Sequence, residues 1–123
     1  MQHSILIVED EKMVREGLVR AFSNTYRMYQ ASNGREAVDV IKKNSEIRVI
    51  VSDLKMPELD GFELLEQVKT TNKKIDVIFV TAFYSIESAV DAIKKGAFEY
   101  MTKPVDIKKL EQTIKNAIEG ADG

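Results

Sequence analysis

The sequence contains no cysteine, which excludes a disulfide scaffold, a thiolate metal site and a cysteine nucleophile. Its only histidine, His3, precedes the first apolar run, so neither a Ser-His-Asp triad nor a histidine metal cluster can be built. No apolar run approaches the ~20 residues of a membrane span, and the N-terminus lacks the basic start and apolar core of a signal peptide. We therefore expect a soluble, cytoplasmic chain with no membrane contact.

An excess of charge of one sign is also missing. The 18 basic and 20 acidic residues give a formal net charge of −2, so the chain lacks the excess of positive charge that sequence-independent binding of nucleic acid requires. The sequence has no Gly-x-x-x-x-Gly-Lys or Gly-x-Gly-x-x-Gly loop, so a P-loop NTPase and a dinucleotide-binding enzyme lose their main support. With 123 residues, of which 44% are hydrophobic and 31% charged, the chain predicts one globular domain.

Short β-rich runs alternate with helical patterns along the chain. The first, third and fourth runs are continuously apolar, as in strands buried on both faces, whereas the second and fifth suit sheet edges. This alternation predicts an α/β fold, a doubly wound parallel sheet of five strands with five helices. The predicted strands are 5–8, 26–31, 48–51, 77–80 and 98–101. The apolar faces of the predicted helices begin at Val14, Ala37, Phe62, Ile86 and Ile107.

The predicted helix ends carry residue types that such positions favour. Asn33 and Ser85 can cap the second and fourth helices, because a side-chain oxygen there accepts a hydrogen bond from a free backbone N–H. Gly96 can end the fourth helix. The fourth helix repeats apolar residues at helical spacing, which predicts an apolar face made of Ile86, Ala89, Val90 and Ile93.

Acidic residues directly follow two of the predicted strands. Glu9, Asp10 and Glu11 come after the first, and Asp53 comes after the third. Ligands of a doubly wound sheet bind beyond the carboxyl ends of its strands, so the acids share one rim if these strands are neighbours. Such a cluster is unfavourable without a cation, and carboxylate oxygens with room for water suit Mg²⁺. Singly, each acid has an ordinary explanation, because acids favour helix starts and Asp favours turns.

Two other strand ends carry a hydroxyl and an ammonium group. Thr81 ends the fourth strand, and the small Ala82 beside it would leave the crevice open. Lys103 follows the fifth strand and could neutralise a transferring phosphoryl group. Ordinary β-propensity would explain Thr81 by itself, and Lys103 by itself would be one of many solvated lysines. In the loop after the third strand, Lys55 is expected to point outward, and Gly61 to supply a special backbone angle or close packing.

Taken together and in chain order, these residues resemble the receiver domain of two-component response regulators. The likeness spans nearly the whole chain, and residues 81–106 most resemble receivers of bacterial enhancer-binding transcription activators. It implies a flavodoxin-like strand order, 2-1-3-4-5. We expect the receiver domain to cover residues 1–119, with a polar tail or the start of a linker at 120–123. The matching segments are Ile5–Glu11, Val51–Gly61, Val80–Ala82 and Gly96–Pro104.

The resemblance implies a role for each site residue. Asp53 matches the phosphoacceptor. Glu9 and Asp10 match the acidic pair that holds Mg²⁺, with Asp10 as a direct ligand and Glu9 often acting through water. The backbone carbonyl of Lys55 matches a further metal ligand, and Lys103 matches the lysine that contacts the phosphate. The Lys103–Pro104 bond matches a peptide bond that the family usually keeps cis.

A conformational switch is implied as well, with Thr81 as its hydroxyl and Tyr100 as its aromatic residue. The phosphoryl group would draw in the Thr81 hydroxyl, the Tyr100 ring would turn inward, and the face of the fourth helix, fifth strand and fifth helix would change shape. We expect that face to control an output. Its mixed charges could pair across a phosphorylation-dependent homodimer; they are Asp91, Lys94, Lys95, Glu99 and Lys108.

The implied partners are a sensor histidine kinase or phosphotransfer protein as phosphodonor, and an output domain beyond Gly123. The domain itself would contact no nucleic acid. It would be a signalling domain that catalyses its own phosphoryl transfer and dephosphorylation, rather than an enzyme acting on other molecules.

Three alternatives stay open. A flavin-binding module would need a loop rich in Ser, Thr and Gly where Glu9–Glu11 stands. A Mg²⁺-dependent phosphatase with an aspartyl nucleophile would need a second Asp at the position of Lys12, and a cap domain. A receiver used only for interaction would not need the acceptor site, which is intact here.

Overall fold

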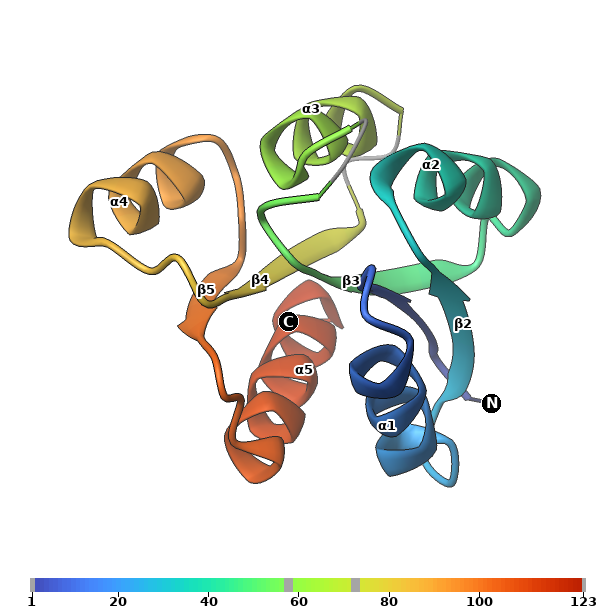
Figure 1. The fold of residues 1–123 in the computed structure, drawn as a ribbon. Helices are drawn as coiled ribbons and strands as arrows, with labels where there is room; N and C mark the ends of the chain where they lie inside the picture. Colours follow the sequence, from blue (N-terminus) through green and yellow to red (C-terminus); the bar gives the residue numbers. More distant parts are fainter. Residues whose placement is uncertain (1, 57–58, 72–73, 123) are drawn as a thin grey trace.

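The computed structural model describes residues 2–56, 59–71 and 74–122 (Figure 1). Strands and helices alternate along the chain, as the sequence predicts. The strands are β1 (Ser4–Val8), β2 (Arg27–Ala31), β3 (Ile47–Ser52), β4 (Asp76–Thr81) and β5 (Glu99–Thr102). The helices are α1 (Lys12–Phe22), α2 (Gly34–Lys43), α3 (Gly61–Thr71), α4 (Ile86–Lys94) and α5 (Ile107–Asp122).

The five strands form one parallel sheet in the order β2-β1-β3-β4-β5. Helices α1 and α5 cover one face, and α2, α3 and α4 lie on the other (Figure 1). The predicted doubly wound fold and its strand order are therefore confirmed. The order of strands reverses between β1 and β3, which is where open α/β sheets bind their ligands.

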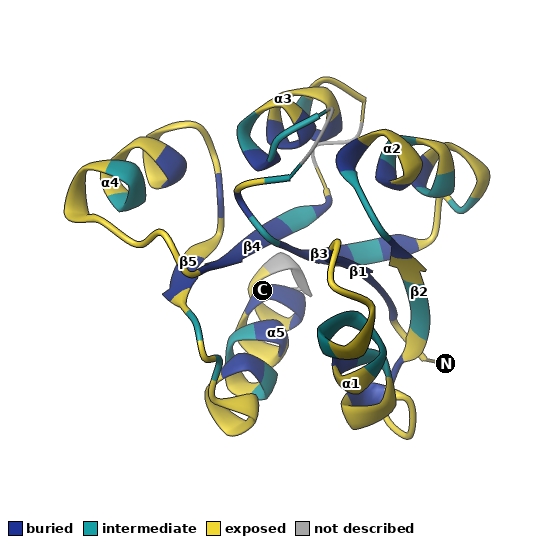
Figure 2. Cartoon of the chain, in the orientation of Figure 1, coloured by how far each residue is buried: buried dark blue, intermediate teal, exposed yellow. Residues whose placement is uncertain are grey.

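The three central strands are buried on both faces, because most of their residues are apolar and helices cover both sides (Figure 2). Residues that alternate along each strand enter two separate core layers. β2 and β5 lie at the edges, as expected from their mixed sequences. Two rigid apolar layers therefore hold the carboxyl ends of β1, β3 and β4 in fixed relative positions.

Side-chain caps and a glycine define the ends of the helices that follow β2 and β4. Asn33 Oδ1 accepts a hydrogen bond from the Glu36 N–H at 2.8 Å, and Ser85 Oγ accepts one from Ser88 at 3.0 Å. Gly96 has a φ of 106°, a left-handed conformation that favours glycine after a helix. The predicted caps and the predicted stop at Gly96 are confirmed.

The predicted apolar face of α4 is mostly exposed, so it does not act as a core face. Ile86, Val90 and Ile93 are 79%, 46% and 49% exposed, and of the residues in this helix only Ala92 is buried. Figure 2 accordingly shows α4 mostly in the colour of exposed residues. The helix rests on the four-residue edge strand β5 through its small residues, and a strand that short covers little of a wide apolar stripe. The stripe is an apolar surface open to a partner.

Helix α5 continues to Asp122, so the backbone of residues 120–122 is helical where a polar tail or linker was expected. The boundary of the domain at residue 119 stays a prediction. Within the described residues, no helix combines the length and hydropathy needed to cross a bilayer.

A hydrogen bond near the sheet edge gives a testable pH effect. The Tyr29 hydroxyl donates to Glu46 Oε1 at 2.6 Å, and this bond holds the pKa of Glu46 below its ordinary value. A carboxylate with a lowered pKa in the folded state contributes stability at neutral pH, which is lost as the pH falls through that lowered pKa. In Tyr29→Phe we expect the Glu46 pKa to rise toward the ordinary glutamate value. An NMR titration of the Glu46 carboxyl carbon measures it, and an unchanged midpoint would contradict the assignment.

Candidate functional site

Three carboxylates meet at the carboxyl ends of β1 and β3. The two strands are paired with Val8 opposite Ser52, so Glu9 and Asp53, the next residues, lie on one rim. One carboxylate oxygen each from Glu9, Asp10 and Asp53 lies within 4.8 Å of the others. The structure thus brings together three of the four acids expected at these two strand ends, whereas Glu11 is exposed and contributes only its backbone N–H, to Glu9.

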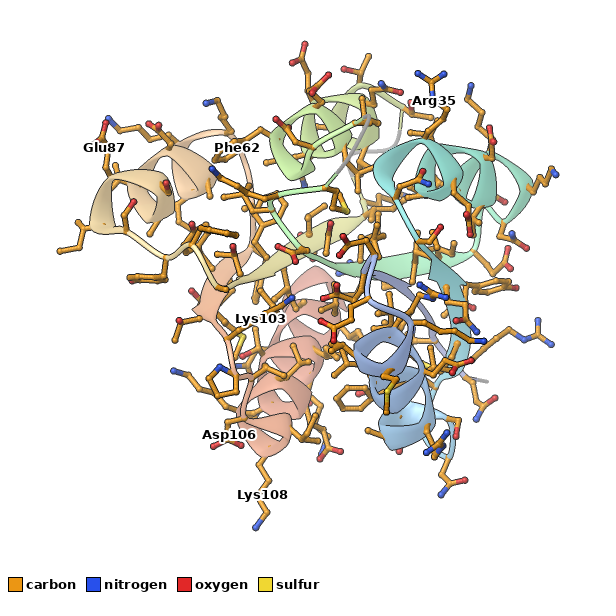
Figure 3. The ribbon with its side chains drawn as sticks, in the orientation of Figure 1. Arg35, Phe62, Glu87, Lys103, Asp106 and Lys108 are labelled. Atoms are coloured by element: carbon orange, nitrogen blue, oxygen red, sulfur yellow. The ribbon has the colours of Figure 1, made fainter. Side chains whose placement is uncertain are left out.

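Lys103, which Figure 3 labels, stands directly after β5 and reaches two of these carboxylates. Its Nζ donates to Glu9 Oε1 at 2.6 Å and to Asp53 Oδ2 at 2.9 Å. The Lys103 backbone N–H donates to the Thr81 carbonyl at 2.9 Å, and the Lys103–Pro104 peptide bond is cis, as the resemblance implies. One ammonium group therefore bridges two carboxylates that would otherwise repel each other.

Glu9 is the most buried of the three acids, with 3% of its surface exposed. Burial raises the pKa of Glu9, and the hydrogen bond from Lys103 and that from the Glu11 N–H to Oε2, at 3.0 Å, act against this increase. Burial alone would lower the pKa of Lys103, but its hydrogen bonds to Glu9 and Asp53 outweigh burial and raise it. The ammonium of Lys103 is therefore held in its charged form at neutral pH.

Thr81 and Ala82 stand at the end of β4, and Lys55 stands in the loop after β3. Thr81 is fully buried, and its Oγ1 accepts a hydrogen bond from the Phe83 N–H at 3.1 Å. Ala82 is exposed and lines the crevice. Lys55 is exposed, as expected; its backbone N–H donates to Asp53 Oδ1 at 3.3 Å, and its Nζ lies 5.0 Å from the centre of the Phe83 ring. The Lys55–Phe83 contact connects the loops after β3 and β4, and no pattern in the sequence indicates it.

The ring of Tyr100 already lies inside the domain. It is 6% exposed and packs against Phe79 and Tyr84, with ring centres 6.4 and 5.1 Å away. The inward turn of this ring on phosphorylation stays a prediction; in this structure two aromatic neighbours already stabilise the inward position. Its buried hydroxyl has no hydrogen-bond partner among the described residues.

An apolar trough of about 540 Å³ opens beside the acids, between α1 and the segment that joins β5 to α5. Strand residues form its floor, and Val14, Leu18 and Val105 are among its walls. Glu9, Asp53 and Lys103 also line it. A molecule that reaches Asp53 from this side would therefore meet apolar surface next to the charged groups.

The donor set fits a hard divalent cation. Three carboxylates converge, Asp10 is exposed to water, and the Lys55 carbonyl belongs to the loop that follows Asp53. Mg²⁺ binds through one or two carboxylates and keeps several waters, which suits an open rim rather than a closed cage. The absence of cysteine and of any second histidine leaves oxygen as the ligand type.

Comparisons with known proteins point to the same family. The family model described as the response regulator receiver domain matches residues 5–115. The chain is 35% identical over 120 residues to the transcriptional regulatory protein ZraR of Klebsiella oxytoca, covering 95% of this chain and 26% of ZraR. It is 36% identical over 121 residues to the sensor kinase CckA of Brucella abortus, covering 97% of this chain and 13% of that protein. The chain spans about a quarter or less of the length of these relatives.

Solved structures with a similar fold also belong to receiver domains. A response regulator receiver domain protein from Clostridium thermocellum superposes with a TM-score of 0.91 at 30% identity, covering 97% of this chain and 96% of that one. A chain of the CheX–CheY–BeF3–Mg²⁺ complex from Borrelia burgdorferi superposes with a TM-score of 0.88 at 27% identity, covering 94% and 88%. In sequence and in strand order, this chain belongs to the response regulator receiver domain family.

Proposed function

We propose that this domain accepts a phosphoryl group on Asp53 in a Mg²⁺-dependent reaction and thereby changes the face formed by α4, β5 and α5. The observation that carries the proposal is the bridge from Lys103 to both Glu9 and Asp53, with Asp10 close by. This arrangement provides a carboxylate nucleophile, a fixed positive charge and a set of oxygen ligands within one crevice.

In the proposed reaction, an Asp53 oxygen attacks the phosphorus of a phosphohistidine on a sensor kinase or phosphotransfer protein. The O–P bond forms, the N–P bond breaks, and the imidazole leaves with the electron pair and takes up a proton. Lys103 stabilises the charge that spreads over the phosphoryl oxygens. Water later attacks the same phosphorus and returns Asp53 and inorganic phosphate. The apolar trough beside Asp53 supports docking of a donor whose phosphohistidine is flanked by apolar side chains.

Asp10 and Asp53, with the Lys55 carbonyl, are the residues we assign to direct Mg²⁺ binding. Glu9 is assigned to an outer position, because it is the most buried of the three acids and its carboxylate is held by Lys103 and by the Glu11 N–H. When bound, Mg²⁺ supplies positive charge that offsets the repulsion between Asp53 and the incoming phosphoryl group. The solved complex from Borrelia burgdorferi contains BeF3 and Mg²⁺ with a related fold, which supports the assignment by analogy.

We assign the switch to Thr81 and Tyr100. The Thr81 hydroxyl accepts a hydrogen bond from the Phe83 N–H, and the phosphoryl oxygens would draw the hydroxyl away from this donor. The Tyr100 ring is stabilised inside by two aromatic neighbours, whereas its hydroxyl is buried without a described partner, which costs about 1–3 kcal/mol. The buried hydroxyl opposes the aromatic packing, and we propose that a change at Thr81 alters the balance between inward and outward positions of the ring.

The output face is assigned from exposed apolar residues of α4 and of the segments on either side of it, which include Tyr84, Ile86, Val90 and Phe98. Of these, Tyr84 packs against Tyr100. Such a patch fits an interface better than a free surface. Of the charges expected to pair across a dimer, Lys95 lies over the Phe62 ring of α3 at 4.6 Å and is engaged within the domain. The relatives are longer regulatory proteins and a kinase, which supports an output domain outside this chain.

Phosphorylation is expected to favour a homodimer through this face. With beryllofluoride and Mg²⁺, sedimentation should show dimerisation of the wild type but not of Val90→Asp, since a buried unpaired carboxylate opposes association. Met13→Asp, on the exposed side of α1, is the matched control and should dimerise normally. If Val90→Asp dimerises like the wild type, or the wild type stays monomeric, the dimer interface is wrongly assigned.

The proposed function is tested by incubation with acetyl phosphate and measurement of intact mass. The wild type should gain one phosphoryl group with Mg²⁺ present and none after chelation of the metal. Asp53→Asn should gain none under either condition. A phosphoryl group on the wild type that is indifferent to Mg²⁺, or an equal gain by Asp53→Asn, would refute the proposal.

A further inference from the structure

We propose that Arg15 is a positioning residue for the cation site: its guanidinium fixes the Glu9 carbonyl and, through it, the placement of Asp10. This inference rests on the proposed function, because it assumes that Asp10 is a metal ligand. Nothing in the sequence singled out Arg15, which lies on α1 among other charged residues.

Arg15 joins two separate parts of the fold. Its Nη1 donates to the Glu9 carbonyl oxygen at 2.9 Å, and its Nε donates to Gln30 Oε1 at 3.0 Å. Glu9 belongs to the segment between β1 and α1, whereas Gln30 belongs to β2. Arg15 is half-buried, and the planar guanidinium holds its N–H groups in a fixed geometry. The loop is therefore held against both the helix and the sheet edge.

These contacts determine where the Asp10 backbone lies. The Glu9 N–H donates to the Ala31 carbonyl at 3.0 Å, and the Glu9 carbonyl accepts the hydrogen bond from Arg15. Both backbone polar groups of Glu9 are therefore held in place. Because a peptide unit is planar, fixing the Glu9 carbonyl fixes the plane that contains the Asp10 nitrogen and Cα. Asp10 is exposed and no packed core surrounds it, so its carboxylate depends on the backbone for its position beside Asp53.

A positioning role and a purely electrostatic role predict opposite signs. A positive charge near the acids repels a metal cation, so removal of the Arg15 charge alone would tighten Mg²⁺ binding. If Arg15 positions Asp10, its removal loosens the ligand set and weakens binding. Loss of a group that orients a metal ligand typically weakens affinity by about 10–100-fold.

The test is the Mg²⁺ dissociation constant, measured by calorimetry at a temperature where circular dichroism shows each variant folded. We expect both Arg15→Met and Arg15→Lys to weaken Mg²⁺ binding by roughly tenfold or more. Lysine keeps the positive charge but lacks the planar guanidinium that donates to two acceptors at once. Lys12→Met, an exposed charge on the same helix, is the control and should bind equally or more tightly. Gln30→Leu removes only the second anchor on an exposed edge strand and should weaken binding in the same direction by a smaller factor.

The result that overturns the inference is binding by Arg15→Met and Arg15→Lys as tight as, or tighter than, that of the wild type. If Arg15→Met does not fold, Arg15→Lys and Gln30→Leu provide the test. Unchanged Mg²⁺ binding in both variants then overturns the inference. In each of these cases wild-type binding leaves the proposed function intact. A wild type that binds no Mg²⁺ at all would instead remove the metal site and, with it, this role of Arg15.

Discussion

Replacement of Lys103 by methionine should lower the rate of phosphoryl transfer to Asp53 by roughly 10²–10³-fold, while the domain binds Mg²⁺ more tightly. The rate falls because the ammonium is the fixed positive charge beside the acceptor, with its Nζ 2.9 Å from Asp53 Oδ2. Affinity for Mg²⁺ rises because, in the wild type, the Lys103 ammonium is hydrogen-bonded to the carboxylates of Glu9 and Asp53 and repels a second cation. Acetyl phosphate kinetics and calorimetry measure the two effects independently.

A slower phosphoryl transfer together with tighter Mg²⁺ binding is expected only if Lys103 has the proposed role. A variant that was merely destabilised would lose both together. Lys94→Met changes an exposed lysine of α4 and serves as the control, with neither quantity expected to change. If Lys103→Met transfers phosphate at the wild-type rate, Lys103 does not stabilise the transition state. If Lys103→Met instead binds Mg²⁺ more weakly, the bridge is needed to shape the metal site.

Gly61→Ala should destabilise the domain by about 2–3 kcal/mol and also impair phosphorylation. An added Cβ would lie 2.7 Å from a carbon of the Phe79 ring, 2.9 Å from the Leu54 Cα and 3.0 Å from the Asp53 carbonyl oxygen. Phe79 is fully buried, so it has no room to move, and the strain passes to the backbone that carries Asp53. Urea unfolding measures the stability, and acetyl phosphate kinetics in the folded range measure the displacement of Asp53.

Gly17→Ala is the matched control for this prediction. Gly17 lies within α1, and a Cβ added there would meet no atom within 4 Å. Alanine is the better helix former, so this variant should be more stable by up to about 1 kcal/mol. Equal stability changes in Gly17→Ala and Gly61→Ala would mean that close packing at Gly61 is unimportant. The sequence offered either a special backbone angle or close packing at Gly61, and the contacts select close packing.

Much of this fold follows from the sequence because its signals are local. Continuous runs such as Ile5–Val8 predict buried strands, and their alternation with helices predicts parallel pairing. Parallel strands place their carboxyl ends on one rim, which is how Glu9 and Asp53, 44 positions apart in the sequence, could be expected together. The helix caps at Asn33 and Ser85 were predictable for the same reason, since each bond joins residues three apart.

Features that depend on contacts between distant segments were not predictable. Periodicity identifies the apolar stripe of α4, but it does not tell whether another element covers Ile86 or Val90. The inward position of Tyr100 depends on packing against Phe79 and Tyr84. The bridge from Lys103 to Glu9 joins residues 94 apart, and the burial that raises the Glu9 pKa comes from the completed fold. Such effects belong to tertiary structure, which a pattern along the chain does not record.

The identity of the side chain that carries the phosphoryl group decides whether the proposed function is right. Borohydride reduces an aspartyl phosphate to homoserine, which marks the position permanently in a peptide map. After reaction with acetyl phosphate and Mg²⁺, we predict homoserine at position 53 and at no other acidic residue. Homoserine at Asp10 or at another carboxylate, or a phosphorylated chain with Asp53 unchanged, would contradict the account.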